Sequence, residues 1–201
     1  MAWSRTNSRA GLPEEQPNLE ASEYQVLEKL RDGSTIAIRA IRADDQKRFA
    51  RAFAQFAASP DSVRFRFHGF RRSLSEREAT DMTGVDFVNH VALVATFGIE
   101  TEQPLTGVGR YILCDGGRKR AELAFAVLDK HQGKGIGSLL LQHLVIIGKA
   151  QGLREFVADV LADNKPMLSV LEHSGFPIKH SREGGVERLV LTLDAPQLSY
   201  V

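Results

Sequence analysis

Three closely spaced glycines lie between a strand-like run and a helical run, in the segment 132–138, QGKGIGS. Gly133, Gly135 and Gly137 carry no Cβ atom, so a bulky anion could approach their backbone closely. The amide N–H groups of this segment would point away from the start of the following helix, where the helix dipole favours negative charge. The spacing therefore predicts an anion site, most simply one that holds a phosphate.

Two common phosphate-binding loops do not fit this spacing. A P-loop needs Gly-x-x-x-x-Gly-Lys-Ser/Thr, but Gly133-Lys134 is followed by Gly135, so the metal-binding hydroxyl is missing from its place. A dinucleotide loop needs Gly-x-Gly-x-x-Gly after the first strand of its domain, whereas Ser138 holds the third glycine position here. The loop also comes late in the chain, with too little sequence after it to build a dinucleotide-binding sheet.

Several strands are predicted before the loop. A β-hairpin is expected over residues 24–42, because alternating apolar residues flank the turn signal Asp-Gly at 32–33. Three further strands are expected at Val88–Thr96, Leu105–Cys114 and Lys119–Leu128. We expect these three to pair antiparallel in succession.

Two helices are predicted between the hairpin and these strands. The first opens with the acids of Ala43-Asp-Asp and ends before Pro60. Its expected core residues are phenylalanines at helical spacing: Phe49, Phe53 and Phe56. The second opens with the capping-box spacing Ser75-Glu-Arg-Glu78. We expect both helices on one face of the sheet.

After the loop the hydrophobic period becomes that of a helix. A helix with a broad apolar face is expected over Gly135–Gln151, and a strand over Arg154–Leu161. A strand, helix and strand of this length imply a right-handed crossover between parallel strands. A short helix at Asn164–Ser174 and a closing hairpin of Pro177–Arg182 and Val186–Leu193 complete the prediction.

The composition is that of an ordinary globular chain. Its 201 residues are 43% hydrophobic and 25% charged, which is enough for one well-buried core. We expect one domain over residues 21–195, with a mobile N-terminal extension at 1–20 and a tail at 196–201. The extension could instead be an arm that docks on a partner through Trp3.

Charge and cysteine content limit the possible partners. A net charge of +1 implies neither a nucleic-acid nor a membrane-surface partner. Residues 62–72 interleave Arg with Phe, which can indicate nucleic-acid binding, but a connection with buried phenylalanines is the favoured interpretation. Cys114 is the single cysteine and fits a reducing compartment. Without a signal peptide or an apolar run of the ~20 residues that span a bilayer, a cytoplasmic protein is expected.

The loop and the sequence after it resemble the acyl-CoA site of the GNAT N-acetyltransferases. The family signature Gln/Arg-x-x-Gly-x-Gly/Ala is matched by Gln132, Gly135 and Gly137, and Asn164 and Gly-Phe at 175–176 follow in the same order. The resemblance implies a mixed α/β sheet of the GNAT fold, mostly antiparallel, with helices on both faces. It also implies a splay between the two parallel middle strands.

The resemblance spans roughly Val26–Leu193 and implies a position for each part of acetyl-CoA. The backbone groups that the splay would leave free for pantetheine are those of Phe125, Ala126 and Val127. The residues whose amides would hold the pyrophosphate are Gln132, Gly133, Lys134, Gly135, Ile136, Gly137 and Ser138. Lys134 and Lys130 could screen the phosphates or be ordinary solvated lysines. Asn164 resembles an asparagine on the CoA side, with helix capping as its alternative role.

A carboxylate precedes the loop on the strand that would hold the thioester. Amide formation needs a neutral amine, and a free lysine has a pKa near ~10.4, so some group must accept a proton. Strand alternation places Glu122 on one face with Ala124 and Ala126. Glu122 is the expected general base, directly or through water; the alternative is an exposed strand glutamate without a role. Many family members carry a tyrosine as general acid where this chain has Leu171.

Three segments also resemble the catalytic domain of bacterial Pat-type protein lysine acetyltransferases, in which a glutamate on the last of them is the base: LRDGSTIAIRAIRADD at 30–45, SVRFRFHGF at 62–70 and AELAFAV at 121–127. This implies acetyl transfer from acetyl-CoA to a primary amine, above all a protein lysine. A small amine as acceptor, or a non-catalytic module that binds acyl-CoA, stays open as an alternative. The six histidines show no metal-ligand spacing, so no metal is expected. No oligomeric state is indicated.

Overall fold

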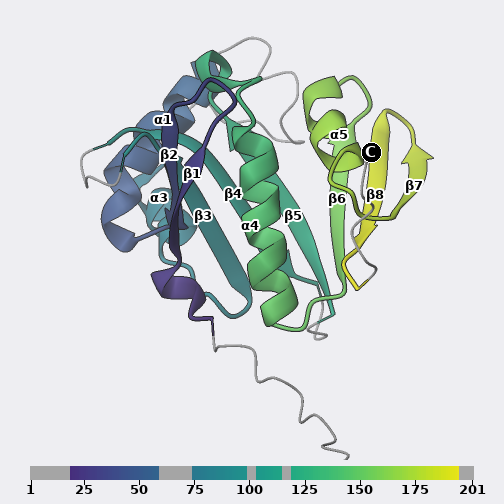
Figure 1. Ribbon diagram of the computed structural model, residues 1–201. Helices are drawn as coiled ribbons and strands as arrows, with labels where there is room; N and C mark the ends of the chain where they lie inside the picture. Colours follow the sequence, from purple (N-terminus) through teal and green to yellow (C-terminus); the bar gives the residue numbers. More distant parts are fainter. Residues whose placement is uncertain (1–18, 59–73, 99–102, 115–118, 195–201) are drawn as a thin grey trace, which may run out of the picture.

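A single mixed sheet runs through the protein. The computed structural model describes residues 19–58, 74–98, 103–114 and 119–194 (Figure 1). Eight strands form the sheet in the order β1-β2-β3-β4-β5-β6-β8-β7. Most of the expected N-terminal extension, the expected C-terminal tail and the Arg-Phe segment 62–72 lie outside the described residues.

The strands follow the predicted pattern. Their bounds are β1 (Gln25–Lys29), β2 (Thr35–Ala40), β3 (His90–Thr96), β4 (Leu105–Leu113), β5 (Arg120–Val127), β6 (Glu155–Leu161), β7 (Ile178–Glu183) and β8 (Val186–Thr192). Both predicted hairpins are confirmed, since β1 pairs antiparallel with β2 and β7 with β8. The three successive antiparallel strands are confirmed as β3, β4 and β5.

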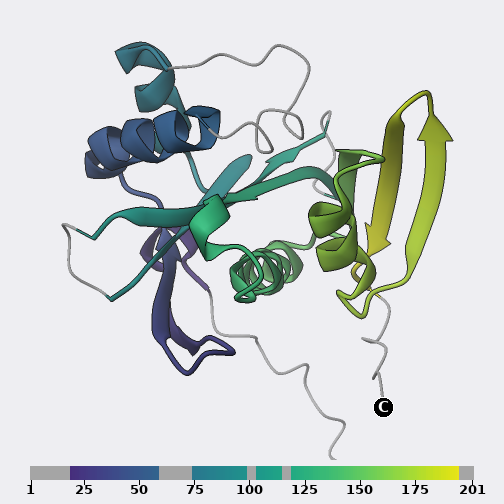
Figure 2. The same cartoon turned by 90° about the horizontal axis from the view of Figure 1, so that it is seen from above.

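Helices cover both faces of the sheet, as the resemblance implied. Their bounds are α1 (Gln46–Ala58), α3 (Glu76–Thr83), α4 (Ile136–Ala150) and α5 (Lys165–Glu172), with 3-10 turns η1 (Ala21–Glu23), η2 (Ala43–Asp45) and η3 (Asp129–His131). Figure 2 shows α1 and α3 together on one face and α4 on the other. No helix among the described residues is long and apolar enough to cross a membrane.

The first two helices form largely as the sequence predicts. The capping box of α3 is present: the N–H of Glu78 donates to Ser75 Oγ (3.3 Å), and the N–H of Ser75 donates to the Glu78 carboxylate (2.9 Å). In α1, Phe49 and Phe56 are buried in the core. Phe53 is only partly buried, so the expectation of three core phenylalanines holds for two of them.

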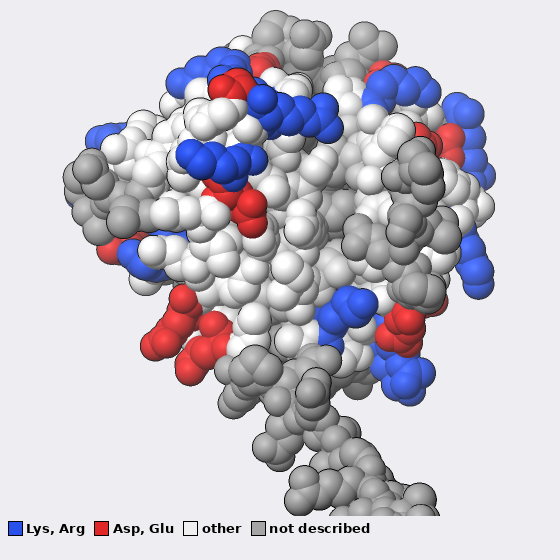
Figure 3. Space-filling model, viewed as in Figure 1, with Lys and Arg blue, Asp and Glu red and all other residues white. Residues whose placement is uncertain are grey.

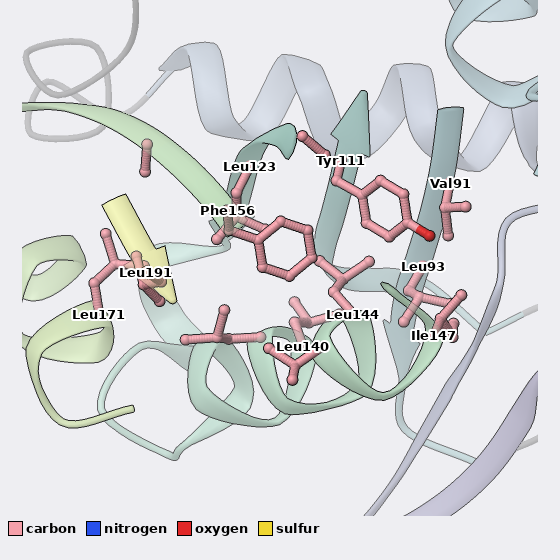
Figure 4. Close-up of a cluster of buried hydrophobic side chains, with 14 of the residues drawn as sticks. Val91, Leu93, Tyr111, Leu123, Leu140, Leu144, Ile147, Phe156, Leu171 and Leu191 are labelled. Carbon is pink, nitrogen blue, oxygen red and sulfur yellow. The ribbon is translucent and has the colours of Figure 1, made fainter. Parts of the chain in front are cut away.

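The larger core lies between the sheet and α4 (Figure 4). Leu140, Leu144 and Ile147 project from α4 and are fully buried. They meet a layer of strand residues in which the rings of Tyr111 and Phe156 lie 5.4 Å apart between centroids. Burial of this α4 face is the main favourable term that holds the helix across the sheet.

Two glycines in β4 allow α4 to lie close to the sheet. A Cβ atom at Gly107 would come within 3.2 Å of Ile136 Cγ2 and Leu140 Cδ1. A Cβ at Gly109 would come within 3.0 Å of Leu144 Cδ1 and 3.3 Å of Leu140 Cβ. Because these two side chains are missing, the first half of α4 can pack close to β4.

The chain crosses from β5 through α4 to β6, and the two strands are parallel as predicted. Their pairing is short: it begins at Arg120↔Glu155 and ends at Glu122↔Val157, although β5 continues to Val127 and β6 to Leu161. Figure 1 shows the two strands diverging beyond this point. The splay that the resemblance implied is therefore present.

Candidate active site

The splay leaves one edge of β5 without a partner strand. At the ends of β5 the N–H of Cys114 donates to Arg120 O (3.0 Å), and the N–H of Leu128 donates to Thr106 O (2.9 Å). Because the β4–β5 register is continuous, even-numbered β5 residues direct their backbone groups toward β4. The odd-numbered residues direct theirs toward β6: Leu123 lies at the end of that pairing, and Phe125 and Val127 lie beyond it, in the splay.

This direction corrects one expectation from the sequence. Ala126 was expected to offer free backbone groups, but its N–H and C=O belong to the ladder with Val108 of β4. Leu123 lies at the end of the pairing with β6, so Phe125 and Val127 are the residues on the open edge. The carbonyl of Val127 is also engaged, because Gln132 Nε2 donates to it (3.2 Å) as well as to Asp129 Oδ1 (3.0 Å). The Gln132 side chain thus ties the loop to the end of β5.

The glycine loop has the open backbone that an anion site requires. Gly133 (φ 76°) and Gly135 (φ 94°) are in the left-handed region, which other residues adopt rarely. Leu139 N–H donates to Gly135 O (3.0 Å), so the amides of the three residues before Leu139 precede the first bond of α4. A Cβ at Gly133 would meet nothing within 4 Å. The loop residues present therefore fit a phosphate group.

Gly137 differs from the other two glycines. A Cβ at this position would lie 3.4 Å from Val170 Cγ2 and 3.5 Å from Phe125 Cε2. These are ordinary van der Waals distances, so a Cβ atom would fit there between β5, α4 and α5. The sequence pattern predicted one role for all three glycines, whereas Gly137 lies inside α4 and only Gly133 and Gly135 have the left-handed backbone of the loop.

Lys134 is held by a distant part of the chain. Its Nζ lies 2.9 Å from Asp32 Oδ2 in the β1–β2 turn, and 5.9 Å from the centroid of the Phe97 ring. Hydrogen bonds from Ser34 and Lys134 hold the pKa of Asp32 below its usual range. The sequence indicated the turn and the loop separately, but no local pattern could join residues 102 positions apart.

Glu122 stands where the pairing of β5 with β6 ends. Its side chain is exposed and lies on the α1/α3 face, because Ala126, two alternations further, packs against the core on that face. Opposite Glu122 in β4 is Ile112, whose side chain is 48% exposed. An acceptor that approaches the splay from this face would meet a carboxylate beside an apolar surface.

Three further residues on this face were not indicated by the sequence. Arg110 of β4 donates to the Met82 sulfur (2.8 Å) and lies 3.4 Å from His90 Nε2. Burial lowers the pKa of Arg110 to about 10. Burial, with the nearby Arg110 charge, lowers the pKa of His90 to about 4. At neutral pH this cluster therefore keeps one positive charge, on Arg110.

The helix after β6 resolves two expectations. Asn164 caps α5, since its Oδ1 accepts from Met167 N–H (3.2 Å), so the capping role is confirmed and a role toward CoA stays a prediction. Leu171 is fully buried in the core. The two described tyrosines are engaged elsewhere: Tyr111 OH donates to Gln151 Oε1 (2.7 Å), and Tyr24 OH lies 2.6 Å from His143 Nδ1.

The surface over the site carries charges of both signs. In Figure 3 basic and acidic side chains gather at the upper edge, where the β1–β2 turn and the glycine loop lie, while the surface over the middle of α4 is uncharged. Within the described ranges, no group of three or more His, Cys, Asp or Glu side chains could hold a metal ion.

Taken together, the site offers an extended backbone edge, an anion loop at its end and a carboxylate at its start. Such an edge can pair with the amides of an extended ligand as a further strand would, and the loop can hold the ligand's phosphates. The carboxylate can accept a proton from a group that reacts near the start of the edge.

Comparison with known proteins identifies a family whose members are similar to this chain. The model of the acetyltransferase (GNAT) family matches residues 64–176. The solved GNAT domain of S. lividans PAT is 35% identical, with a TM-score of 0.74 over 84% of this chain and 96% of that domain. The acetyltransferase PA5475 of Pseudomonas aeruginosa is 29% identical over 75% of this chain and 79% of its own length.

A second curated relative is longer than this chain. The acetyltransferase Pat of Mycolicibacterium smegmatis is 29% identical over 73% of this chain, but the match spans only 43% of the relative. Since the family model covers more than half of this chain, and the S. lividans domain is matched almost throughout, the chain belongs to the GNAT family of acetyltransferases, which use acetyl-CoA.

Proposed function

We propose that this acetyltransferase modifies the side chain of a lysine in a protein, with Glu122 as general base. The observation that carries the proposal is the layout of β5. Glu122 marks the start of the open edge, and the glycine loop follows the end of the same strand. One strand would thus hold the thioester, and its two ends would supply the base and the anchor for the phosphates.

The donor would lie along the open edge of β5. The backbone groups of Phe125, with the C=O of Leu123 and the N–H of Val127, would pair with the amides of the pantetheine arm. The pyrophosphate would rest on the loop amides from Gln132 to Ser138, over Gly133 and Gly135. The fit is supported by the direction of these backbone groups and by the open space at Gly133.

In the proposed acetyl transfer, one carboxylate is sufficient to account for the proton that the amine loses. The acceptor nitrogen forms a bond to the acetyl carbon as the bond from that carbon to sulfur breaks. Glu122 takes the proton that the amine loses, directly or through water. The departing thiolate takes its proton from solvent, because a free thiol has a pKa of only about 8.5 and leaves without a strong acid. Leu171, buried in the core, supplies none.

A protein lysine is supported as the acceptor by two observations. The chain resembles Pat-type enzymes along the strand that carries Glu122, and its relatives include proteins of that name. The face around Glu122 exposes apolar side chains at Ile112 and Met82, which suits the surface around a protein lysine better than a small polycationic amine. A polycation would be held best by several carboxylates.

The test is a transfer assay with ¹³C-labelled acetyl-CoA. The protein is incubated with a cell lysate, and in parallel with a library of small primary amines, and products are identified by mass spectrometry. We expect labelled lysines in a limited set of proteins. If only small amines carry the label, the acceptor is a small amine and the proposal of a protein lysine is wrong. If neither mixture carries the label, a module that binds acyl-CoA without catalysis is favoured.

A further inference from the structure

An unpaired arginine lies at the tip of the first hairpin. Arg31 is exposed in the β1–β2 turn, and no carboxylate among the described residues lies within 4.0 Å of its side-chain nitrogens. The carboxylate of its neighbour Asp32 already has other partners. The Asp32 carboxylate accepts from the N–H of Ser34 (3.0 Å) and from Lys134 Nζ (2.9 Å).

The guanidinium of Arg31 lies over the open side of the glycine loop. A Cβ placed on Gly135 would meet a single atom within 4 Å, and that atom is Arg31 Nε at 4.0 Å. At Gly133 it would meet none. Figures 1 and 2 show the β1–β2 turn beside the start of α4. A ligand that rests on the loop at Gly135 would therefore have the Arg31 guanidinium beside it.

The partner of Lys134 makes this position important. From the sequence, Lys134 could either screen the phosphates or be an ordinary solvated lysine; in the structure its charge is balanced by Asp32 in the ion pair. The pair is over a third exposed at both ends, so it adds little to stability, yet the two charges cancel at a distance. Among the turn residues 30–34 and Lys134, the charges of Asp32 and Lys134 cancel, and the remaining charge is that of Arg31.

We propose that Arg31 binds the pyrophosphate of acetyl-CoA, so that the β1–β2 turn forms one wall of the donor site. This rests on the proposed placement of acetyl-CoA along β5 and the loop. A guanidinium is suited to the role because its planar fork can donate two parallel hydrogen bonds to phosphate oxygens, whereas a lysine ammonium acts as a point charge. The 2.9 Å contact between Asp32 and Lys134 shows that the turn lies beside the loop.

The test compares three donors by calorimetry: acetyl-CoA, 3′-dephospho-acetyl-CoA and S-acetylpantetheine, the last by displacement. For Arg31→Met we expect an affinity for acetyl-CoA lower by about tenfold, the size of one charge-assisted contact. The same factor is expected for the 3′-dephospho form, and no change for S-acetylpantetheine, which has no pyrophosphate. Arg31→Lys should retain part of the affinity. The matched control is Arg182→Met in the exposed β7–β8 hairpin, which should bind all three as the unaltered protein does.

Each other outcome overturns the assignment. Unchanged affinity of Arg31→Met for acetyl-CoA would show that the turn contributes nothing. An equal loss for S-acetylpantetheine would mean that the substitution disturbs the site as a whole. A loss confined to acetyl-CoA would move the contact to the 3′-phosphate. If the unaltered protein binds no acetyl-CoA at all, the proposed donor site fails, and this inference fails with it.

Discussion

At the scale of single residues, the partner of a side chain decides what its charge can do. Lys134 lies in the glycine loop, as the sequence indicated, but the carboxylate of Asp32 balances its charge. His143 lies on the buried face of α4, where its Nδ1 is 2.6 Å from Tyr24 OH. Its Nε2 is 3.2 Å from Glu28 Oε1, which is an ion-pair distance without hydrogen-bond geometry. These contacts join α4 to the first hairpin.

Buried histidines should make the protein less stable in acid. Burial lowers the pKa of His143 below the ordinary 6.5, and it lowers the pKa of His90 to about 4. Between the lowered folded values and 6.5 the unfolded chain binds protons that the folded chain does not, so the contribution of these histidines to stability is fully present above pH 6.5 and is lost as the pH falls. Urea unfolding at pH 7.5 and 5 should show a lower midpoint at pH 5.

The substitution His143→Gln isolates the contribution of one histidine. It removes the titrating group, so the difference between the two midpoints should become smaller than in the unaltered protein. His173→Gln, on an exposed histidine of the α5 C-terminus, is the control and should leave the difference as it was. An unchanged difference in His143→Gln would show that this histidine does not couple folding to pH.

At the scale of elements, hydrophobic periodicity was sufficient for most of the fold. The predicted strand at Leu105–Cys114 is β4 (Leu105–Leu113), and the predicted helix at Gly135–Gln151 is α4 (Ile136–Ala150). The splay could not be predicted from periodicity, because β5 alternates along its whole length and nothing in it indicates that pairing with β6 stops at Glu122. It came from the family resemblance instead.

The pairing register of β4 and β5 explains why the backbone of Ala126 was wrongly expected to be free. Side-chain alternation can be predicted from sequence, and it placed Glu122 and Ala126 on one face, as the structure does. The direction of the backbone groups depends on which residues of β4 lie opposite, and this register is a tertiary property. Ala126 was therefore assigned to the open edge, although its backbone faces β4.

The packing of α4 on β4 gives a prediction at this scale. Gly109→Ala should lower the free energy of unfolding by about 1–3 kcal/mol, because the new Cβ would lie 3.0 Å from Leu144 Cδ1 and 3.3 Å from Leu140 Cβ. Chemical denaturation measures the change. Gly185→Ala is the matched control, since a Cβ there meets nothing within 4 Å, and it should be near neutral. Equal stability of the two variants would mean that α4 can move away from β4 without cost.

At the scale of the whole molecule, the sheet separates two tasks. In the proposed function the edge of β5 and the glycine loop hold the donor, while Glu122, Ile112 and Arg110 face the side where α1 and α3 pack. The family could be predicted from sequence, because one continuous segment, 121–138, carries its signature. The proposed acceptor surface could not, because it combines side chains from β3, β4, β5 and α3 that no single motif brings together.

The most direct test of the account separates donor binding from chemistry in Glu122→Gln. The Glu122 side chain is exposed, so the Glu122→Gln variant should fold normally. We predict that the variant binds acetyl-CoA with unchanged affinity by calorimetry, while transfer of labelled acetyl to lysine falls by about 10²- to 10³-fold, the usual contribution of a general base. Glu23→Gln, an exposed glutamate in η1, is the control and should keep full activity. Normal turnover in Glu122→Gln would contradict the account, because Glu122 could then not be the base.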